Sequence, residues 1–227
     1  MTAAQERQRK IRQISRRLVR ETQGVAIVEC AFSLPILMIF LASGLELANL
    51  VLATKRVGDL AAMVADNASR MGQRSNGLSV RQISEAEIND VFIGADLQAD
   101  LRDFRANGRI ILSSLQRNAD DGQWIAWQRC FGENGIGSTY GIEGDGATGT
   151  SFEGMGPPGN TVQAPTGTAL MVVEVHYNYE PFFPIFYLPG RTMTEFAVFN
   201  VRELRDLTSP PRNAENVEIA SCEVVLP

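Results

Sequence analysis

The sequence has few of the residues and none of the short motifs that common enzymes use. Its 227 residues include one histidine, three cysteines and two tryptophans. G-x-S-x-G, H-E-x-x-H, C-x-x-C and glycine-rich phosphate loops are all missing. Alternation along Val173, Val175 and Tyr177 predicts that the only histidine, His176, lies on the opposite face of a strand, toward solvent. We therefore expect a protein that is not an enzyme, with no catalytic residue and no cofactor.

The acidic residues of the middle of the chain do not form a recognisable metal motif. Carboxylate oxygens suit Ca²⁺, but none of these residues has the spacing of an EF-hand loop. Acidic loop residues are usually solvated, so no metal site is predicted and calcium stays an alternative. The residues considered are Asp120, Asp121, Glu133, Glu143, Asp145 and Glu153.

The net charge of -5 is the sum of two unlike regions. Residues 1–23 carry seven basic and two acidic side chains, a balance of +5, and the other 14 basic and 24 acidic side chains give -10. The basic residues occupy one short stretch beside an apolar segment, not a folded face. This pattern excludes nucleic acid as the expected partner and favours a basic cytoplasmic leader, residues 1–24.

A transmembrane helix is predicted directly after the leader, over residues 25–55. From Cys30 to Ala53, 18 of 24 residues are aliphatic, aromatic or Cys, and only Glu46 is charged. Glu29 and Glu46 bracket 16 uncharged residues, which is about 24 Å of helix and close to the thickness of a hydrocarbon core. The basic leader places the N-terminus in the cytoplasm and the rest of the chain outside it. A secretory signal peptide and a plain single-pass anchor remain alternatives.

An extracytoplasmic α+β domain is predicted over residues 56–227. Small and apolar residues at spacings of three and four continue the helix over 56–72, where they form a stripe that can pack on a sheet. Pro35 is expected to kink or loosen the membrane part of this long helix. A capping box at Ser84 opens a short helix to about Ile93. Four strands are expected, over 109–117, 123–131, 168–179 and 193–204.

Two further features of the outer region are a glycine-rich segment and a pair of cysteines. Residues 132–159 contain ten of the 20 glycines and are predicted to be a surface loop, the likeliest place for variation or contact. Cys130 and Cys222 are expected to form one disulfide in an oxidising compartment, with two free buried thiols as the alternative. Cys30 is expected to face lipid or to be packed.

The leader and the membrane segment resemble a known family. Gly24 is followed five residues later by Glu29 at the start of an apolar helix, which is similar to the processing signature of type IV pilins and pseudopilins. Glu29, Pro35, the turn at residues 44–47 and the Ala-rich stretch over residues 61–68 resemble the TadE-like family, the minor pilins or pseudopilins of the Tad (Flp-type) pilus. Residues 172–184 and a strand ending at 201–202 are similar to the end of the outer domain in that family.

The resemblance implies a fold, partners and site residues. The fold would be pilin-like: the long N-terminal helix spans the membrane and packs by its C-terminal half on an antiparallel sheet of about four strands. A prepilin peptidase would cut between Gly24 and Val25. The other partners would be the major Flp-type pilin, other TadE-like or TadF-like minor pilins and the inner-membrane pilus platform, in a bacterial inner membrane with the outer domain periplasmic or extracellular.

The residues of the membrane segment suggest how such a subunit assembles. A carboxylate in an apolar helix is costly without a partner, so Glu29 is expected to pair with a new ammonium at Val25 of its own chain or a neighbour. The alternative is that Glu29 only marks the membrane edge. Gly44 is expected to admit another helix, and Glu46 to make helix contacts or lie at the interface. The alternative function is an uncleaved, anchored envelope protein, an adhesin or ligand sensor that binds through the glycine-rich loop.

Overall fold

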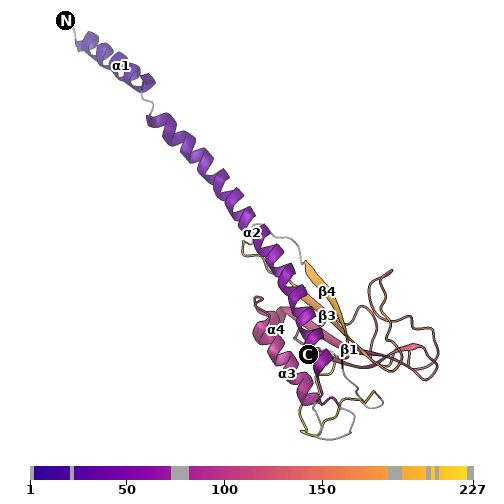
Figure 1. Cartoon of the computed structure of the whole chain (residues 1–227). Coiled ribbons are helices and arrows are strands. Elements are labelled where there is room, and N and C mark those ends of the chain that lie inside the picture. The colour runs from indigo at the N-terminus through magenta and orange to yellow at the C-terminus, as the bar shows by residue number, and fades with distance from the viewer. Residues whose placement is uncertain are drawn as a thin grey trace. The chain divides into compact units, whose positions relative to one another are not determined.

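The computed structural model describes residues 3–20, 23–72, 82–183, 191–202, 206–207 and 210–223. The chain divides into two compact units, Met1–Ala48 with Phe183–Phe186, and Asn49–Phe182 with Tyr187–Pro227. The elements, shown in Figure 1, are α1 (Ala3–Arg20), α2 (Gln23–Arg70), α3 (Glu85–Gln98), α4 (Phe104–Asn107), β1 (Gly108–Arg117), β2 (Gln123–Phe131), β3 (Leu170–Asn178) and β4 (Thr192–Asn200). They form the α+β arrangement expected from the sequence, with one long apolar helix and a four-stranded antiparallel sheet.

Helix α2 has 48 residues, and it begins and ends within two residues of the range that the apolar pattern predicts. Its helical structure is unbroken at Pro35, so the expected loosening stays a prediction. The helix is followed by Gly72, whose φ of 112° is a left-handed conformation that favours glycine. The backbone N–H of Gly72 donates to Glu87 Oε1 at 3.2 Å, so the end of α2 is tied to the first turn of α3. Ser75, Asn76 and Gly77, whose composition is typical of a turn, lie outside the described ranges.

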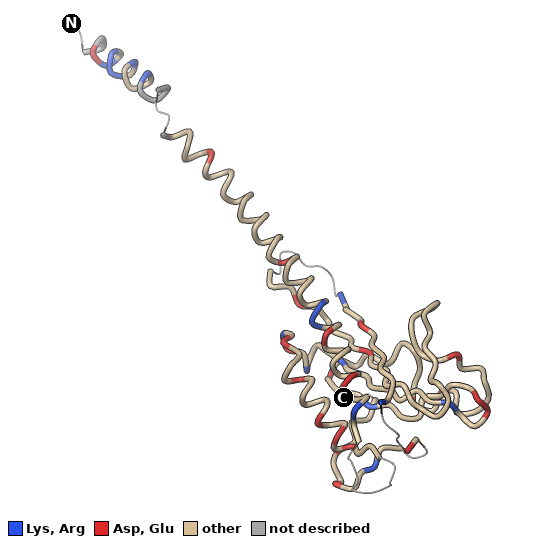
Figure 2. Tube along the Cα trace, in the orientation of Figure 1, with Lys and Arg blue, Asp and Glu red and all other residues tan. Residues whose placement is uncertain are grey.

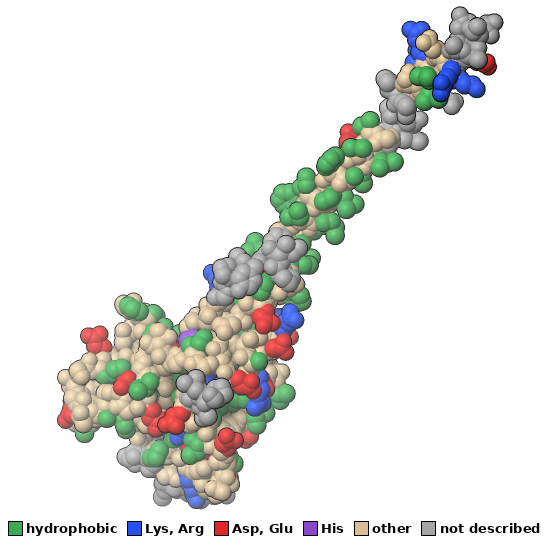
Figure 3. All heavy atoms as spheres, turned by 180° about the vertical axis from the view of Figure 1, so that it is seen from behind, with side chains coloured by type: hydrophobic (Ala, Val, Ile, Leu, Met, Phe, Trp, Pro, Cys, Tyr) green, Lys and Arg blue, Asp and Glu red, His purple; other side chains and the backbone are tan. Residues whose placement is uncertain are grey.

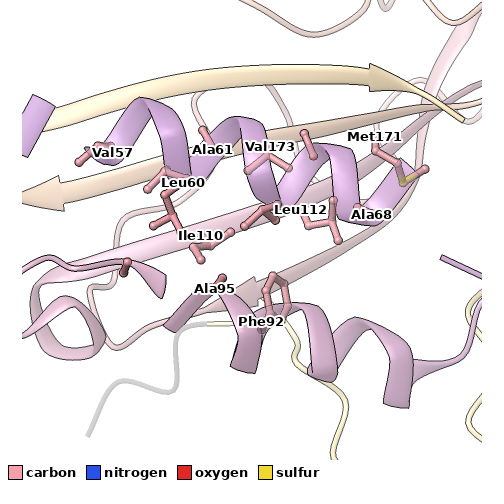
Figure 4. Close-up of a cluster of buried hydrophobic side chains, with 14 of the residues drawn as sticks. Val57, Leu60, Ala61, Ala68, Phe92, Ala95, Ile110, Leu112, Met171 and Val173 are labelled. Carbon is pink, nitrogen blue, oxygen red and sulfur yellow. The ribbon is translucent and has the colours of Figure 1, made fainter. Parts of the chain in front are cut away.

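The second half of α2 carries the stripe that covers the sheet. Seven small or apolar side chains at spacings of three and four are buried in one core cluster with residues of β1, β3 and α3 (Figure 4). They are Val57, Leu60, Ala61, Val64, Ala65, Ala68 and Met71. The alanines allow the helix to approach the sheet closely, which explains the Ala-rich composition here.

The sheet has the order β2-β1-β3-β4, with every neighbouring pair antiparallel. β1 and β2 form the expected hairpin. The long connection after β2 returns the chain to the other side of β1, where Ile110 lies opposite Val175 and Leu112 opposite Val173. The two central strands, β1 and β3, are almost entirely buried, as strands covered on both faces should be.

Helix α3 begins with the predicted capping box. The N–H of Glu87 donates to Ser84 Oγ at 3.2 Å, and Glu87 Oε2 accepts from the N–H of Ser84 at 3.0 Å. The helix runs five residues past the predicted end at Ile93, and its inner side chains, including Ile88 and Phe92, join the main core. The one-turn helix α4 was not expected, because a single turn leaves no periodicity to recognise.

The glycine-rich segment is more than a surface loop, which corrects the sequence prediction. Part of it packs on the face of the sheet opposite α2, where a second apolar cluster contains Met155, Tyr140 and Phe152 from the loop with Leu115 and Ile125 from the strands. The loop also forms backbone hydrogen bonds with β2. The N–H of Ile125 donates to the carbonyl of Asp145, and the N–H of Gly144 donates to the carbonyl of Ile125, both at 2.9 Å.

His176 is consequently buried, with 2% of its surface exposed, and the prediction that it faces solvent is wrong. It does lie on the face opposite Val175 and Tyr177, as alternation requires. The error lies in what covers that face: the loop brings Ser138 and Thr139 to the neighbouring Glu174. Alternation distinguishes the two faces of a strand but not which of them is solvated.

Candidate functional site

The first half of α2 is the most unusual surface of the protein. It belongs to the one described helix that is long and apolar enough to cross a membrane, with a mean hydropathy of 2.4 over its best 18-residue window. None of that window is buried inside the chain, and large apolar side chains are exposed all round it, among them Phe32, Ile36 and Phe40 (Figure 3). An apolar surface of this extent needs lipid or other helices to cover it.

The site residues at the start of this helix are all exposed. Gly24, Val25 and Glu29 lie in the first two turns of α2. A Cβ added at Gly24 would meet no atom within 4 Å, so nothing in the described chain covers this position. Val25 and Glu29 are four residues apart and therefore lie on the same side of the helix. No described side chain forms an ion pair with Glu29.

Pro35 and Cys30 occupy the middle of the same exposed surface. Pro35 has no N–H, so the carbonyl of Ala31, four residues earlier, lacks its helical donor. Cys30 is exposed, with no disulfide. Ser33 donates its hydroxyl to the carbonyl of Cys30 at 3.4 Å, so its polar group is satisfied within the helix.

Gly44 and Glu46 lie on different sides of the helix and have different surroundings. A Cβ at Gly44 would meet no atom within 4 Å, so this side is open to another helix. Glu46 is buried, with 4% of its surface exposed, and accepts a 3.2 Å hydrogen bond from the backbone N–H of Phe183 in its own chain. Of the two residues expected to pack helices, Gly44 is therefore on the open surface and Glu46 is engaged within the chain.

Asn49, one turn beyond Leu45, also has an intrachain partner. Its side-chain amide donates to the hydroxyl of Tyr179 at 2.7 Å, within the second compact unit. Glu46 was expected to make contacts between helices or to lie at the membrane interface, and Asn49 lies three residues further along the helix. In the structure each is bonded to the segment that follows β3, at 179 and 183 respectively.

In the outer unit, Cys130 and Cys222 form the disulfide that the sequence analysis pairs. It links the end of β2 to the C-terminal segment, and the N–H of Cys130 also donates to the carbonyl of Ala220 at 2.8 Å. Arg109 supports the same junction, donating to the carbonyls of Gly132 at 2.9 Å and Cys222 at 3.2 Å. Burial lowers the pKa of this guanidinium. The disulfide holds the C-terminal segment against the end of β2 and has no part in the apolar helix surface.

A buried ion pair joins α3 to β2 and was not predicted. Arg129 is on the core face of β2 and donates to both oxygens of Glu85, at 2.6 to 3.1 Å, and to Glu143 Oε2 at 3.0 Å. Burial by itself lowers the pKa of Arg129, because it removes water from the guanidinium. The hydrogen bonds to Glu85 and Glu143 and the negative charges of these two residues outweigh this effect and raise the pKa. The arginine is thereby held charged inside the sheet, and its function is structural.

His176 belongs to a second cluster of buried polar side chains. Its Nδ1 is 3.0 Å from Thr194 Oγ1, and Glu174 accepts from the hydroxyl of Ser138 and from the N–H of Thr139 at 2.8 Å. The Nε2 atom is buried with no hydrogen-bond partner among the described residues, 3.7 Å from Glu174 Oε2. Burial, and then the charge of Glu174, raise the pKa of Tyr140 nearby. This cluster holds the loop on the sheet.

The acids considered for calcium are used individually. The described residues contain no group of three or more His, Cys, Asp or Glu that could hold a metal ion. Asp120 accepts from the N–H of Gly149 at 2.7 Å, Asp145 from that of Ile142 at 2.9 Å, and Asp121 pairs with Arg117. These carboxylates stabilise turns of the loop and the hairpin.

Comparison with known proteins adds no relative. No protein-family model, no curated protein and no solved structure matches the chain.

Proposed function

We propose that the chain is a TadE-like minor pilin or pseudopilin, a structural component of a Tad-type pilus that takes part in pilus biogenesis, adhesion or secretion. The observation that carries the proposal is the division of α2. Its first half exposes apolar side chains all round with Gly24, Val25 and Glu29 at its start, while its second half packs on a four-stranded antiparallel sheet. One helix that is both membrane anchor and core element is the organisation expected of a pilin subunit.

In this proposal, α2 crosses a bacterial inner membrane with residues 1–24 in the cytoplasm and the outer domain in the periplasm or extracellular. A prepilin peptidase cuts after Gly24, and the new ammonium at Val25 enters the apolar layer with Glu29. A carboxylate costs about 2.5–3.5 kcal/mol at the centre of a membrane helix on insertion scales, and less toward the edge of the apolar layer, where Glu29 lies. Pairing Glu29 with the ammonium of a neighbouring subunit removes part of that cost only when the helices are in register.

The contacts of the other site residues support this assignment of roles. Gly44 leaves one side of α2 open for a second helix, whereas Glu46 is bonded to Phe183 of its own chain. Glu29 has no described ion-pair partner within the chain, which suits a partner in a second subunit. The partners would be the major pilin, other TadE-like or TadF-like subunits and the pilus platform.

N-terminal sequencing tests the processing step. The full chain is produced in membranes with and without its cognate prepilin peptidase, and the membrane-bound product is sequenced. A mature end at Val25 that depends on the peptidase, and is lost in Gly24→Val, supports the proposal. An intact Met1 with the outer domain still bound to the membrane contradicts processing and favours an uncleaved anchored envelope protein.

Co-purification tests the pairing role of Glu29. Sister subunits are recovered with tagged wild type, with Glu29→Gln and with the matched control Ser33→Ala, one turn further along the same exposed surface. We expect Glu29→Gln to reduce recovery about tenfold, the effect of ~1.4 kcal/mol, and Ser33→Ala to leave it unchanged. Equal recovery with all three proteins would show that Glu29 only marks the membrane edge.

A further inference from the structure

We infer that α1 is an interfacial helix, which lies on the anionic surface of the same bilayer that α2 enters. This inference rests on the membrane insertion of α2 in the proposed function. From the sequence, residues 1–24 are expected only to orient the anchor through their positive charge. The structure makes Ala3–Arg20 a helix of 18 residues, and a helix has faces that a disordered basic segment lacks.

The described side chains of α1 are distributed unevenly around the helix. Ile11 and Ile14 lie three residues apart on one face and are exposed, at 61% and 58%. Arg9, Arg12 and Arg16 follow at spacings of three and four, and at ~100° per residue they occupy the opposite face. Arg7 lies on the isoleucine side, one turn before Ile11, and Lys10 lies beside it, where their long side chains can reach the head groups. Lys and Arg recur along α1 in Figure 2, whereas the first half of α2 carries neither. No described residue of the rest of the chain covers the two isoleucines.

An anionic lipid surface suits both faces at once. Amphipathic helices with basic polar faces bury their apolar side chains ~5–10 Å into the boundary between head groups and acyl chains. Each Lys or Arg near an anionic surface contributes about 1 kcal/mol, or roughly a fivefold gain in binding. A nucleic acid or an acidic protein groove would meet the arginines but would leave the isoleucines in water.

The chain connection makes this surface the nearest one available. Helix α1 ends at Arg20 and α2 begins at Gln23, and the apolar run starts at Val25. Five extended residues span at most about 18 Å. When α2 spans the membrane, the end of α1 is therefore held within about 18 Å of the head groups. Because this tether keeps the local concentration of the surface high, α1 needs little affinity of its own for lipid. In this position α1 fixes the depth at which Gly24 and Glu29 meet the membrane.

Spin-label depth measurements on the full chain test the inference. The chain carries Cys30→Ser and its disulfide is left intact. One label is placed at Ile14→Cys, or at Gln13→Cys, which lies ~100° around the helix from Ile14 on the side of Arg9 and Arg16. Vesicles contain phosphatidylcholine with or without one quarter phosphatidylglycerol. Collision with oxygen reports lipid, and collision with a nickel chelate reports water. We expect Ile14→Cys to report lipid and Gln13→Cys to report water, and this difference to require phosphatidylglycerol.

Two variants separate charge from apolar contact. Arg9→Gln, Arg12→Gln and Arg16→Gln together should lower the ratio of bound to free leader about 100-fold, from about fivefold per charge. Ile11→Ser keeps every charge and should reduce the depth of the Ile14→Cys label. Circular dichroism of each variant verifies that the helical content is retained.

A third label, at Leu41→Cys in the apolar part of α2, distinguishes failure of this inference from failure of the proposed function. Water-exposed labels on both faces of α1 with a lipid-exposed Leu41→Cys label would overturn the inference and leave the anchor intact. A water-exposed Leu41→Cys label would overturn insertion itself, and the inference with it. Protection of α1 by added RNA, but not by phosphatidylglycerol, would also overturn it.

Discussion

The pair of Arg129 and Glu85 should be strongly coupled, and its removal offers a quantitative test of the fold. Glu85 is 1% exposed and the side chain of Arg129 is 9% exposed. Arg129→Met leaves the carboxylate of Glu85 inside the protein with no cation, and Glu85→Gln leaves the guanidinium with a weaker partner. The double variant removes both charges and keeps side chains of similar size.

The burial of the pair sets the size of the effect. Removing one member of a buried pair typically costs 3–5 kcal/mol of stability, because the other charge is left uncompensated. We expect Arg129→Met to cost about 3–5 kcal/mol for the same reason. Glu143 is half exposed and can keep part of its hydration, so it adds little. Replacing both members is often close to neutral. We therefore expect the double variant to be more stable than Arg129→Met, with a coupling of about 2–3 kcal/mol.

Urea unfolding of the full chain in detergent micelles measures this coupling. Both tryptophans, Trp124 and Trp127, are on β2 beside Arg129, so their fluorescence reports the unfolding of this strand. Lys55→Met is the control, because Lys55 and Asp59 form an exposed pair in α2 whose loss should cost at most about 0.5 kcal/mol. Additivity of the two single changes within ~0.5 kcal/mol would refute the reasoning.

Three further predictions concern the outer domain. Replacing Cys130 and Cys222 by serine opens a loop with a sequence separation of 92. In the chain-entropy model the free energy of unfolding should then fall by about 4–5 kcal/mol. Unchanged stability in urea titrations with and without reductant would contradict this. Gly146→Ala should destabilise by at least about 2 kcal/mol, because a Cβ there would be 2.1 Å from the carbonyl oxygen of Gln123 at a φ of 75°, whereas the control Gly137→Ala has open space and should melt with wild type. Burial, and then the charge of Glu180, raise the pKa of Tyr177 above its ordinary 10.0. As pH rises, the unfolded state therefore releases the phenol proton before the folded state does, and the free energy of unfolding should decline beyond about pH 10. Tyr177→Phe should show a smaller decline, and an equal decline in the two proteins would exclude Tyr177 as its cause.

The sequence predicts the parts of the fold whose signals are local. The apolar periodicity of α2, the capping box at Ser84 and the hairpin between β1 and β2 each depend on residues within a few turns of one another. The pairing of Cys130 with Cys222 follows from there being two cysteines outside the membrane segment. At the candidate site, the same local signals identify Gly24 and Glu29, and the structure adds that both are exposed.

The parts that the sequence does not predict depend on contacts across long stretches of chain. Arg129 lies at a position that alternation assigns to the core, and its charge is matched there by Glu85, 44 residues away, and by Glu143 of the loop. His176 is buried because an irregular loop packs over it, and irregular backbone has no periodicity. The helical form of α1 was also not predicted, because the net charge of the leader carries no information on the spacing of its side chains.

The sheet order determines when the core can form during synthesis. The apolar stripe of α2 is complete by Met71, but β3, the strand that covers much of it, begins only at Leu170. At about 5–20 residues per second, the intervening chain takes ~5–20 s to emerge. During that interval the stripe can pack only on α3 and on the hairpin of β1 and β2, without the second central strand. The apolar stripe is therefore fully covered only when the last quarter of the chain has been made.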